Sequence, residues 1–409
     1  MYEPLISALK KSGPDVDSQY DRFVKRVPFP LISAMTIKEG NIKIASSHYE
    51  LFPIGLNHFC KTDFGLLPTA FKKFFKTHYP DYSIKRVLLL VTTQEFNPYY
   101  YEHVSTLVQL FKKSGYKVDL GTLEEISAPI TIKTPSKISL KISPTQVKKN
   151  KLVTTSLEPD FIYFTTKGFS MDLLAKLSHI EQPMNPPLKL FSHREKKSDY
   201  LFLLNRFATE FSQITNTDPW LFKTEFWVEP HVNVDEKNGI EKVAISAQNL
   251  LNTLGMKFKE YQVTQEPSVR LSNNSGTYGM GILSIHSFKD LAALYQRKKA
   301  KMTGSRSQAV INDVLIQEEI PSVPLFEKCN GEIVIYSIGA EMVGGYLQNY
   351  IAFAEKSLTR QHLFMPVCFS SKPHGHTQKR YNRNKNLIYG HLSRIGNLAL
   401  GYTMDKIPS

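Results

Sequence analysis

The segment from residue 85 to residue 121 constrains the fold of this chain more than any other. Residues 86–91 form an almost continuous apolar run, which is typical of a strand buried on both faces of a parallel sheet. Residues 99–113 carry apolar side chains at helical spacing, Gly115 ends this helix, and residues 116–120 predict a second strand. The segment is therefore predicted to be a βαβ unit with a right-handed crossover.

Further patterns extend this unit. Residues 130–142 alternate between apolar and polar around Pro135, which indicates a hairpin, and residues 161–164 predict another buried strand. Residues 183–187 contain several prolines and are predicted to form a connector. The first ~200 residues are therefore expected to form an α/β domain with a mostly parallel sheet.

Composition limits the classes of protein. A chain of 409 residues with 42% apolar residues can form two or three domains. The net charge is +14, but the lysines are spread thinly and accompany no nucleic-acid-binding motif, so attraction for small anionic substrates explains the charge better. There is no run of eighteen apolar residues and no signal pattern, which predicts a cytoplasmic protein without a membrane span. Cys60, Cys329 and Cys368 are far apart without a CxxC pair, which predicts neither a disulfide framework nor a zinc site, so each is expected to be a buried small residue.

A glycine-rich loop occurs in the second half of the chain. Gly276, Gly279 and Gly281 surround Thr277 just after Ser275, with apolar extended stretches on both sides. Between two strands, such a loop lets backbone N–H groups close over a polyphosphate, because glycine has no side chain to block the approach and tolerates φ > 0. The spacing matches neither the Walker motif nor a dinucleotide fingerprint, and a plain hairpin turn explains the three glycines about as well.

Acidic residues follow this loop on later predicted strands. One strand ends in Gln317, Glu318 and Glu319, and two further strands carry Glu332 and Glu341. The first group is expected to meet the adenine and ribose of ATP, because an extended backbone edge can pair with the base. The second pair is expected to hold Mg²⁺, which prefers oxygen ligands and bridges phosphates. Each acid alone is more simply a solvated strand end, and it is their order after the loop that favours an ATP site.

The glycine loop also resembles a family signature. Residues 276–282 are similar to the glycine motif of the proteobacterial glutamate–cysteine ligases, which are related to ATP-grasp enzymes. Further similarities, in the family's order and spacing, lie at residues 51–53 with Gly55 and Asn57, residues 218–220, Lys301 with Met302, residues 314–318, residues 343–346, and Tyr389-Gly390 with Arg394. The resemblance implies an N-terminal α/β substrate domain at residues 1–200 and an ATP-grasp-like nucleotide-binding α+β domain at residues 201–409.

The resemblance also implies an activity. Such enzymes use ATP and Mg²⁺ to join the γ-carboxylate of glutamate to the amine of cysteine through an acyl phosphate, which is the first step of glutathione synthesis. The expected partners are therefore glutamate, cysteine and ATP, with no nucleic acid and no membrane. Catalysis would rest on positioning and charge neutralisation rather than on a covalent intermediate with the protein. The oligomeric state is left open.

The loop, the acids and the resemblance together give the residues expected in the site. Glu332 and Arg394 are expected to act in catalysis, and Glu332 and Glu341 to hold Mg²⁺. Gly55 and Asn57 are expected to bind the substrate amino acids. The nucleotide is expected to bind to Arg270, Ser275, Gly276, Thr277, Gly279, Gly281, Lys301, Gln317, Glu318 and Glu319.

Several polar positions differ from the family pattern. Ser272 and Asn274 stand where the family carries a lysine and an acid, and Arg270 is expected to replace the lysine. Residues 165–167 read Thr-Thr-Lys in place of Asn-Asn-Asp. Further differences lie at Thr36, Lys38, His48, Glu50, Gln348 and residues 356–359. The alternative hypothesis is therefore a homologue that binds nucleotide without joining glutamate to cysteine.

Overall fold

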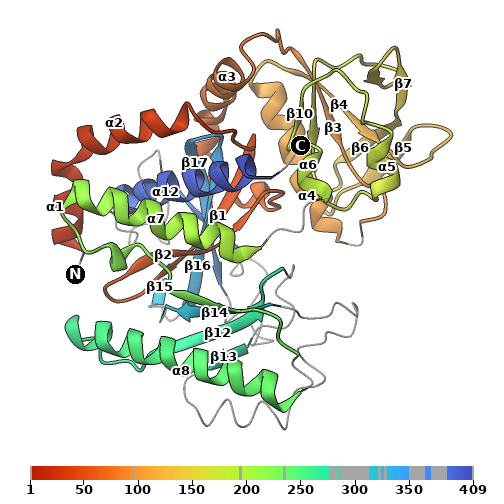
Figure 1. The fold of residues 1–409 in the computed structure, drawn as a ribbon. Helices are drawn as coiled ribbons and strands as arrows, with labels where there is room; N and C mark the ends of the chain where they lie inside the picture. Colours follow the sequence, from red (N-terminus) through yellow and green to blue (C-terminus); the bar gives the residue numbers. More distant parts are fainter. Residues whose placement is uncertain are drawn as a thin grey trace.

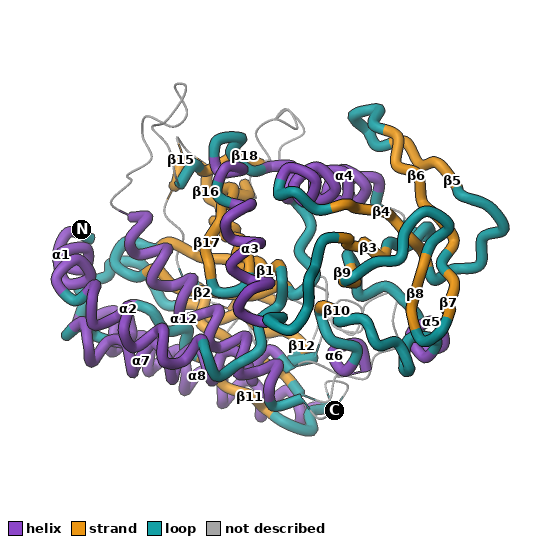
Figure 2. Tube along the Cα trace, turned by 90° about the horizontal axis from the view of Figure 1, so that it is seen from above, coloured by secondary structure: helices purple, strands orange, loops and turns teal. Residues whose placement is uncertain are grey.

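A computed structural model of the protein describes residues 2–95, 97–192, 196–233, 236–275, 283–285, 313–320, 324–326, 329–349, 364–369 and 385–407. These residues form a mixed α/β structure with two six-stranded sheets, a four-stranded sheet and a two-stranded ribbon. In Figures 1 and 2 the mostly parallel sheet lies at one side of the molecule, and helices cover the other six-stranded sheet. Within these residues, no helix is long and apolar enough to cross a membrane.

One six-stranded sheet is mostly parallel and confirms the βαβ prediction. β3 (Arg86–Leu90) pairs in parallel with β4 (Lys117–Thr122), and α4 (Pro98–Lys113) connects the two. β9 (Phe161–Phe164) pairs in parallel with the other side of β3. Residues 87–90 are fully buried, as expected for a strand covered on both faces. The sheet is completed by β10 (Met184–Asn185), β6 (Ser139–Pro144) and β5 (Ile130–Lys133), the last two forming the predicted hairpin.

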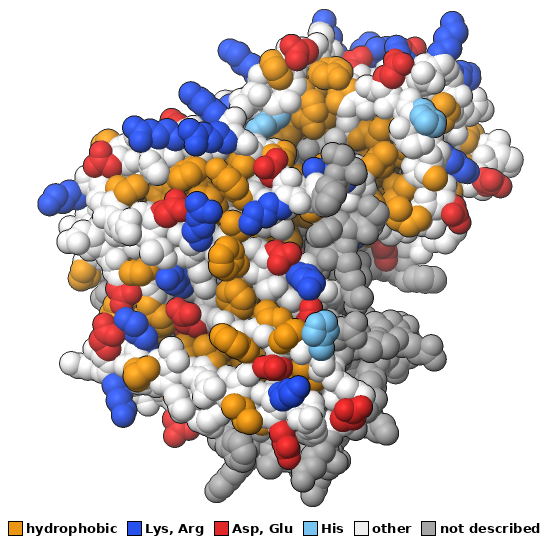
Figure 3. Space-filling view, in the orientation of Figure 1, with side chains coloured by type: hydrophobic (Ala, Val, Ile, Leu, Met, Phe, Trp, Pro, Cys, Tyr) orange, Lys and Arg blue, Asp and Glu red, His pale blue; other side chains and the backbone are white. Residues whose placement is uncertain are grey.

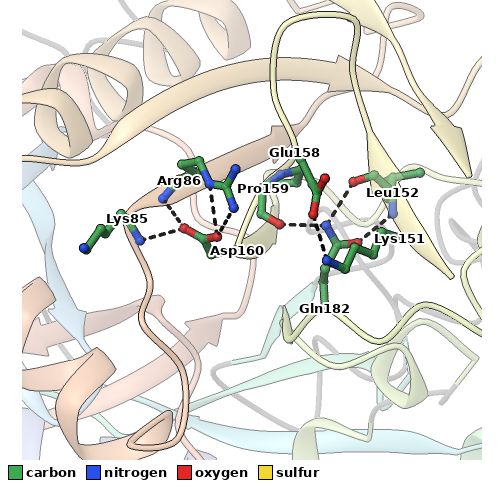
Figure 4. Close-up of polar contacts among 8 residues, drawn as sticks. All are labelled: Lys85, Arg86, Lys151, Leu152, Glu158, Pro159, Asp160 and Gln182. Atoms are coloured by element: carbon green, nitrogen blue, oxygen red, sulfur yellow. Dashed lines mark hydrogen bonds and ion pairs between the residues drawn. The ribbon is translucent and has the colours of Figure 1, made fainter. Parts of the chain in front are cut away.

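Side-chain contacts hold together the starts of β3 and β9 in this sheet and also fix a strand of the two-stranded ribbon (Figure 4). Asp160, just before β9, accepts hydrogen bonds from the Arg86 backbone N–H (2.8 Å) and from Arg86 Nη2 (2.6 Å). Gln182 makes a similar clamp on Leu152 of β8 (Lys151–Val153), accepting from its N–H at 2.6 Å and donating to its carbonyl at 3.0 Å. These polar groups are satisfied by the backbone they hold, so they serve the fold.

The second six-stranded sheet is built from both ends of the chain. β1 (Ile32–Glu39) lies between β2 (Ile44–Glu50) and β16 (Cys329–Ile338) and is antiparallel to both. β17 (Glu341–Asn349) and β18 (Phe364–Val367) continue the sheet beyond β16. The division of the chain at residue 200 stays a prediction, and this sheet takes strands from both sides of it.

Helices cover one face of this antiparallel sheet. α7 (Lys197–Thr215) and α12 (Lys385–Asp405) pack against each other beside it (Figure 1). The sulfur of Met35 on β1 points to this side and accepts a hydrogen bond from Tyr200 Oη at 3.5 Å. Gly396 of α12 permits the close packing, since a Cβ there would lie 2.4 Å from the Met35 sulfur. One face of the sheet is therefore core, and the residues that alternate with Met35, such as Thr36 and Lys38, project from the opposite face.

The four-stranded sheet contains the strands on both sides of the glycine loop. Its order is β11 (Phe226–Glu229), β14 (Val314–Glu319), β12 (Ser268–Asn273) and β13 (Leu283–Ile285), with α8 (Lys237–Glu260) on one face. Val314 and Ile316 belong to the apolar cluster under α8, whereas Leu315 belongs to the main core. Even-numbered residues of β14 therefore face α8, and odd-numbered residues face the antiparallel six-stranded sheet.

A disulfide joins Cys60 to Cys368, which are separated by 308 positions. The prediction that the cysteines form no disulfide is therefore wrong, although both residues are buried as expected. Nothing local to either cysteine indicated the bond, because only the fold brings Cys60 next to Cys368 at the end of β18. Beside the bond, fully buried Asp63 accepts a hydrogen bond from the Phe369 backbone N–H at 2.9 Å.

The remaining elements of the described residues complete the fold. They are α1 (Glu3–Lys11), α2 (Gly13–Val24), α3 (Leu67–His78), α5 (Met171–Ala175), α6 (Lys189–Ser192), β7 (Gln146–Lys148), β15 (Pro324–Phe326), and 3-10 turns at Leu56–His58, Asp63–Gly65 and Pro219–Leu221.

Candidate functional site

The polar face of the antiparallel six-stranded sheet brings several predicted site residues together. Met35 of β1 belongs to the core beneath the helices, so alternation along the strand turns Thr36 and Lys38 to the other side. His48 of β2 lies opposite Thr36 in the antiparallel register. Glu332 of β16 is the neighbour of Lys38. Three adjacent strands therefore contribute polar side chains to one face.

Lys38 connects the two antiparallel sheets. Its Nζ lies 3.4 Å from Glu332 Oε1 on β16 and 3.5 Å from Glu319 Oε1 on β14. The side chains of Lys38 and Glu332 are each 7% exposed, and that of Glu319 is 19% exposed. Two carboxylates from different sheets thus share one ammonium, which offsets the repulsion between them.

Arg270 and Gln317 are the residues of the four-stranded sheet that contact Glu319 and β2. They lie opposite each other in the β12–β14 register, and Arg270 Nη2 donates to Glu319 Oε1 at 2.9 Å. Gln317 Nε2 donates to the Ser47 carbonyl of β2 at 3.0 Å, so β14 contacts the six-stranded sheet directly. These side chains form the inter-sheet cluster, which consists of Lys38, Arg270, Gln317, Glu319 and Glu332.

Glu318 lies on the other side of β14. Its Oε2 accepts hydrogen bonds from Lys43 Nζ at 2.6 Å and from the Glu225 backbone N–H at 3.0 Å. The Lys43 and Glu318 side chains, here called the sealed pair, are only 4% and 1% exposed. Burial raises the pKa of Glu318 and lowers the pKa of Lys43. Glu318 and Glu319 were predicted to act together on the nucleotide, but the alternation of the strand turns them to opposite faces.

Gly55 and Asn57 lie in a loop at residues 54–58 that packs on β16 and β17. Tyr336 of β16 donates a hydrogen bond at 2.7 Å to the backbone carbonyl just before Gly55. Gly55 has a φ of +123°, and a Cβ there would lie 2.7 Å from the Tyr346 hydroxyl, so the loop reaches this position only with glycine. By alternation, Tyr336 projects from the same face of β16 as the inter-sheet cluster, which keeps both loop residues as candidates for substrate contact.

Glu341 and Arg394 are not brought to the inter-sheet cluster. Glu341 follows the turn at the far end of β16, roughly 20 Å from Glu332 at about 3.3 Å per strand residue, and pairs with Lys73 of α3. Arg394 of α12 pairs with Asp17 of α2 in the layer of helices. The structure therefore does not bring Glu332 and Glu341 together, because the two acids lie at opposite ends of the β16–β17 hairpin, and their shared metal site stays a prediction.

The glycine loop itself lies outside the described residues. Gly276, Thr277, Gly279, Gly281 and Lys301 belong to this part, and their role in binding phosphates stays a prediction. The strands on either side are described, and β12 and β13 pair as antiparallel neighbours. Ser275 donates its backbone N–H to Asn273 Oδ1 at 3.0 Å as β12 ends. The predicted strands on both sides of the loop are thus confirmed.

The inter-sheet cluster offers the ligand type that Mg²⁺ prefers. No group of three or more His, Cys, Asp or Glu side chains within the described residues is arranged to hold a metal ion. The carboxylates of Glu319 and Glu332 both contact the ammonium of Lys38, so they converge on the position of that ammonium. Mg²⁺ bound together with phosphates needs only one or two protein carboxylates, so this donor set fits a metal that arrives with a nucleotide.

Lys38 is the residue of this cluster that the sequence did not reveal. It belongs to no motif and was noted only as a difference from the family pattern, together with Thr36, His48 and Glu50. The available signal was a lysine directly after the largely apolar residues 31–37, because a lysine that is buried with such a strand needs an anionic partner. His48 and Glu50 also pair with each other, at 3.2 Å.

Surface charge on one face of the molecule can be followed in Figure 3. Lys and Arg side chains gather mainly along the upper edge, and acidic and basic side chains are interspersed elsewhere. A nucleic-acid-binding surface is usually a continuous basic patch. The predicted absence of a nucleic-acid partner stays a prediction, and the charges on this face do not favour such a partner.

The fold and the cluster define a class of protein: a mixed α/β protein in which acidic and basic side chains meet between two antiparallel sheets. The model of the glutamate–cysteine ligase family (GshA) matches residues 7–404. The chain therefore belongs to the glutamate–cysteine ligase family, and it is a ligase-type enzyme. Membership of this family implies the use of ATP.

Solved structures share the fold. A protein assigned as a γ-glutamylcysteine synthetase from Methylobacillus flagellatus KT aligns with a TM-score of 0.84 and 23% identity, over 99% of this chain and 97% of that chain. A glutathione synthetase-like effector from Globodera pallida aligns with a TM-score of 0.40 and 12% identity, over 84% and 77% of the two chains. D-alanyl-alanine synthetase A from Vibrio cholerae O1 aligns with a TM-score of 0.34 and 12% identity, over 76% and 80%. No curated protein matches the chain significantly.

Proposed function

We propose that this chain joins the γ-carboxylate of glutamate to the amine of cysteine, and that the phosphates of ATP bind at the inter-sheet cluster in an ATP-grasp-like arrangement. The observation that carries the proposal is the contact of Lys38 with Glu319 and Glu332, which draws the two sheets together. Arg270 adds a second cation from β12, the strand that leads into the glycine loop. Phosphates and a divalent cation need such a mixture of basic and acidic groups.

The proposed reaction has two steps. A carboxylate oxygen of glutamate attacks the γ-phosphorus of ATP, the bond to the bridging oxygen breaks, and ADP leaves an acyl phosphate behind. The amine nitrogen of cysteine then attacks the acyl carbon, the bond to the phosphate oxygen breaks, and inorganic phosphate leaves as the nitrogen loses a proton. The protein supplies position and charge neutralisation for both steps.

Each member of the inter-sheet cluster has a role in this proposal. Lys38 and Arg270 neutralise phosphate charge, and Gln317 lies where β14 would meet the adenosine. Glu319 and Glu332 hold Mg²⁺, which when bound offsets the negative charge of the phosphates. The loop at residues 54–58 contacts the amino acid substrates from the same face of the sheet.

Release of ADP and phosphate tests this proposal. The protein is given ATP and Mg²⁺ with glutamate and cysteine together, with each alone, and with neither, and the dipeptide is detected by mass spectrometry. We expect phosphate release at the full rate and dipeptide only when both amino acids are present. ATP turnover that is unaffected by either amino acid would contradict the proposal.

A homologue that binds nucleotide without joining these amino acids is the second candidate. Asn274, at a position where the family carries an acid, accepts the Ser198 backbone N–H at 3.0 Å. Thr165, in the segment that differs from the family's Asn-Asn-Asp, donates to the Leu90 carbonyl at 2.8 Å. Both residues therefore serve the fold. A nucleotide at 100 times its Kd raises stability by about 2.7 kcal/mol, so thermal stabilisation by Mg-ATP without any dipeptide product would favour this candidate.

A further inference from the structure

The ammonium of Lys38 lies where two acidic ligands for a metal converge. It is 3.4 Å from Glu332 Oε1 and 3.5 Å from Glu319 Oε1, and all three side chains are mostly removed from solvent. A divalent cation that binds the same carboxylates would need the same space and would be repelled by the ammonium. Lys38 is therefore placed to affect every metal that enters the inter-sheet cluster.

We propose that Lys38 competes with a divalent cation for the carboxylates of Glu319 and Glu332, so that the metal binds well only together with a nucleotide. Before the nucleotide arrives, the ammonium satisfies both carboxylates and free metal binds weakly. When phosphates enter, they offer the ammonium another anionic partner, and the carboxylates become available. This inference rests on the proposed function, because it takes the nucleotide phosphates to lie at the inter-sheet cluster.

The chemistry of the side chain suits such an exchange. Lysine carries a compact point charge on a flexible four-carbon stem, so its ammonium can move between partners without a change in the backbone. Its two contacts are longer than an ordinary N–H···O hydrogen bond of about 2.9 Å. Arg270 also donates to Glu319 Oε1, at 2.9 Å, so this carboxylate keeps a hydrogen-bond donor when Lys38 leaves.

Binding of Mn²⁺ to the nucleotide-free protein tests the competition. The probe is Mn²⁺ alone, measured by electron paramagnetic resonance or calorimetry with wild type, Lys38→Met, Lys38→Arg and Lys73→Met. Lys73→Met is a matched control, because it also removes one positive charge beside a glutamate, at the exposed pair with Glu341. We expect Lys38→Met to bind one Mn²⁺ at least about tenfold tighter than wild type, and both other variants to bind it like wild type.

A second measurement uses the wild type, in case Lys38→Met does not fold. Acylation of individual lysines is read by peptide mass spectrometry as Mn²⁺ is added without nucleotide. We expect the acylation of Lys38 to rise with Mn²⁺, while that of Lys43 in the sealed pair stays constant. Equal Mn²⁺ affinity of Lys38→Met and wild type, or acylation of Lys38 that does not respond to Mn²⁺, would overturn the inference.

A parallel thermal-shift experiment separates this inference from the proposed function. If Mg-ATP stabilises wild type more than Arg270→Met, and Lys38→Met binds Mn²⁺ like wild type, the proposed nucleotide site stands and the competition is wrong. If Mg-ATP stabilises neither protein, the proposed site itself is wrong, and the inference falls with it.

Discussion

Two lysine–glutamate contacts on opposite sides of β14 contain the same chemical groups in different settings. In the sealed pair, Lys43 Nζ lies 2.6 Å from Glu318 Oε2, and the Glu225 backbone N–H donates to the same oxygen. In the inter-sheet cluster, Lys38 lies at 3.4 and 3.5 Å from two carboxylates on separate sheets. Both contacts join β14 to the antiparallel six-stranded sheet, but the first pairs one ammonium with one carboxylate, whereas the second shares one ammonium between two carboxylates. Burial of a charged residue therefore does not by itself mark a functional site; the number and origin of its partners do.

The largest expected effect on stability lies in the sealed pair. Lys43→Met removes one partner and leaves the Glu318 carboxylate buried, which should lower the free energy of unfolding by about 3–5 kcal/mol. Urea unfolding measures this loss. The double variant Lys43→Met/Glu318→Leu should recover most of it, because replacing a whole buried pair by apolar groups is often nearly neutral. A single variant as stable as wild type would show that the pair is not sealed as described.

The largest expected effect on activity lies in the inter-sheet cluster. Glu332→Gln keeps the shape of the side chain but removes its charge, and we expect turnover to fall by about 100-fold while ATP affinity changes far less. The variant should keep its circular dichroism spectrum. Turnover equal to wild type across a Mg²⁺ titration would exclude Glu332 as a ligand and favour the second candidate function.

The loss of folding stability at acid pH should arise from a different buried group, His391. Burial, with Arg394 nearby, lowers the pKa of His391 to about 3, from an ordinary value of 6.5. The unfolded chain therefore takes up a proton near pH 6.5 and the folded chain does not, so stability is lost as the pH falls from 6.5 toward 3. The loss should approach about 1.4 kcal/mol per pH unit for this histidine.

Urea unfolding of a variant across this pH range checks the assignment. His391→Leu should have a shallower dependence of stability on pH than wild type, and His179→Gln, at an exposed position, should follow wild type. An unchanged slope in His391→Leu would show that this histidine does not remain neutral in the folded protein.

The smallest effect on stability and activity is expected at Glu341. It lies on the same strand hairpin as Glu332, but its side chain is exposed whereas that of Glu332 is buried. Its pair with Lys73 is exposed, with 64% of the lysine and 44% of the glutamate side chain accessible. Glu341→Gln should change the free energy of unfolding by less than about 1 kcal/mol and leave turnover intact. A large loss of turnover in Glu341→Gln would contradict this expectation and support the predicted role of Glu341 as a Mg²⁺ ligand.

Much of the fold could be predicted where the signal was local. The strands at β3 and β9 follow from apolar runs, and α4 follows from helical spacing, because each pattern lies within a short segment. The pairing of β1 with β16 joins residues about 300 positions apart. No pattern within either strand indicates which strand it pairs with. The Cys60–Cys368 disulfide was missed for the same reason.

The site could be predicted in part. The order of Gln317, Glu319 and Glu332 after the glycine loop indicated residues that do meet, although Glu318 and Glu341 were assigned with them. Telling these acids apart needs the register and the direction of each side chain, which sequence spacing alone did not give. Lys38 needed the pairing of β1, which the sequence does not contain as a local pattern.

A crystal structure with Mg²⁺ and a non-hydrolysable ATP analogue tests most directly whether the inter-sheet cluster is the nucleotide site. We expect the phosphates between the four-stranded and the antiparallel six-stranded sheets, with the metal on Glu319 and Glu332 and the Lys38 ammonium on a phosphate oxygen. A nucleotide bound elsewhere would contradict this account. One such place is the pocket of about 620 Å³ beside the parallel sheet, lined in part by Glu124, Gln146 and Lys176.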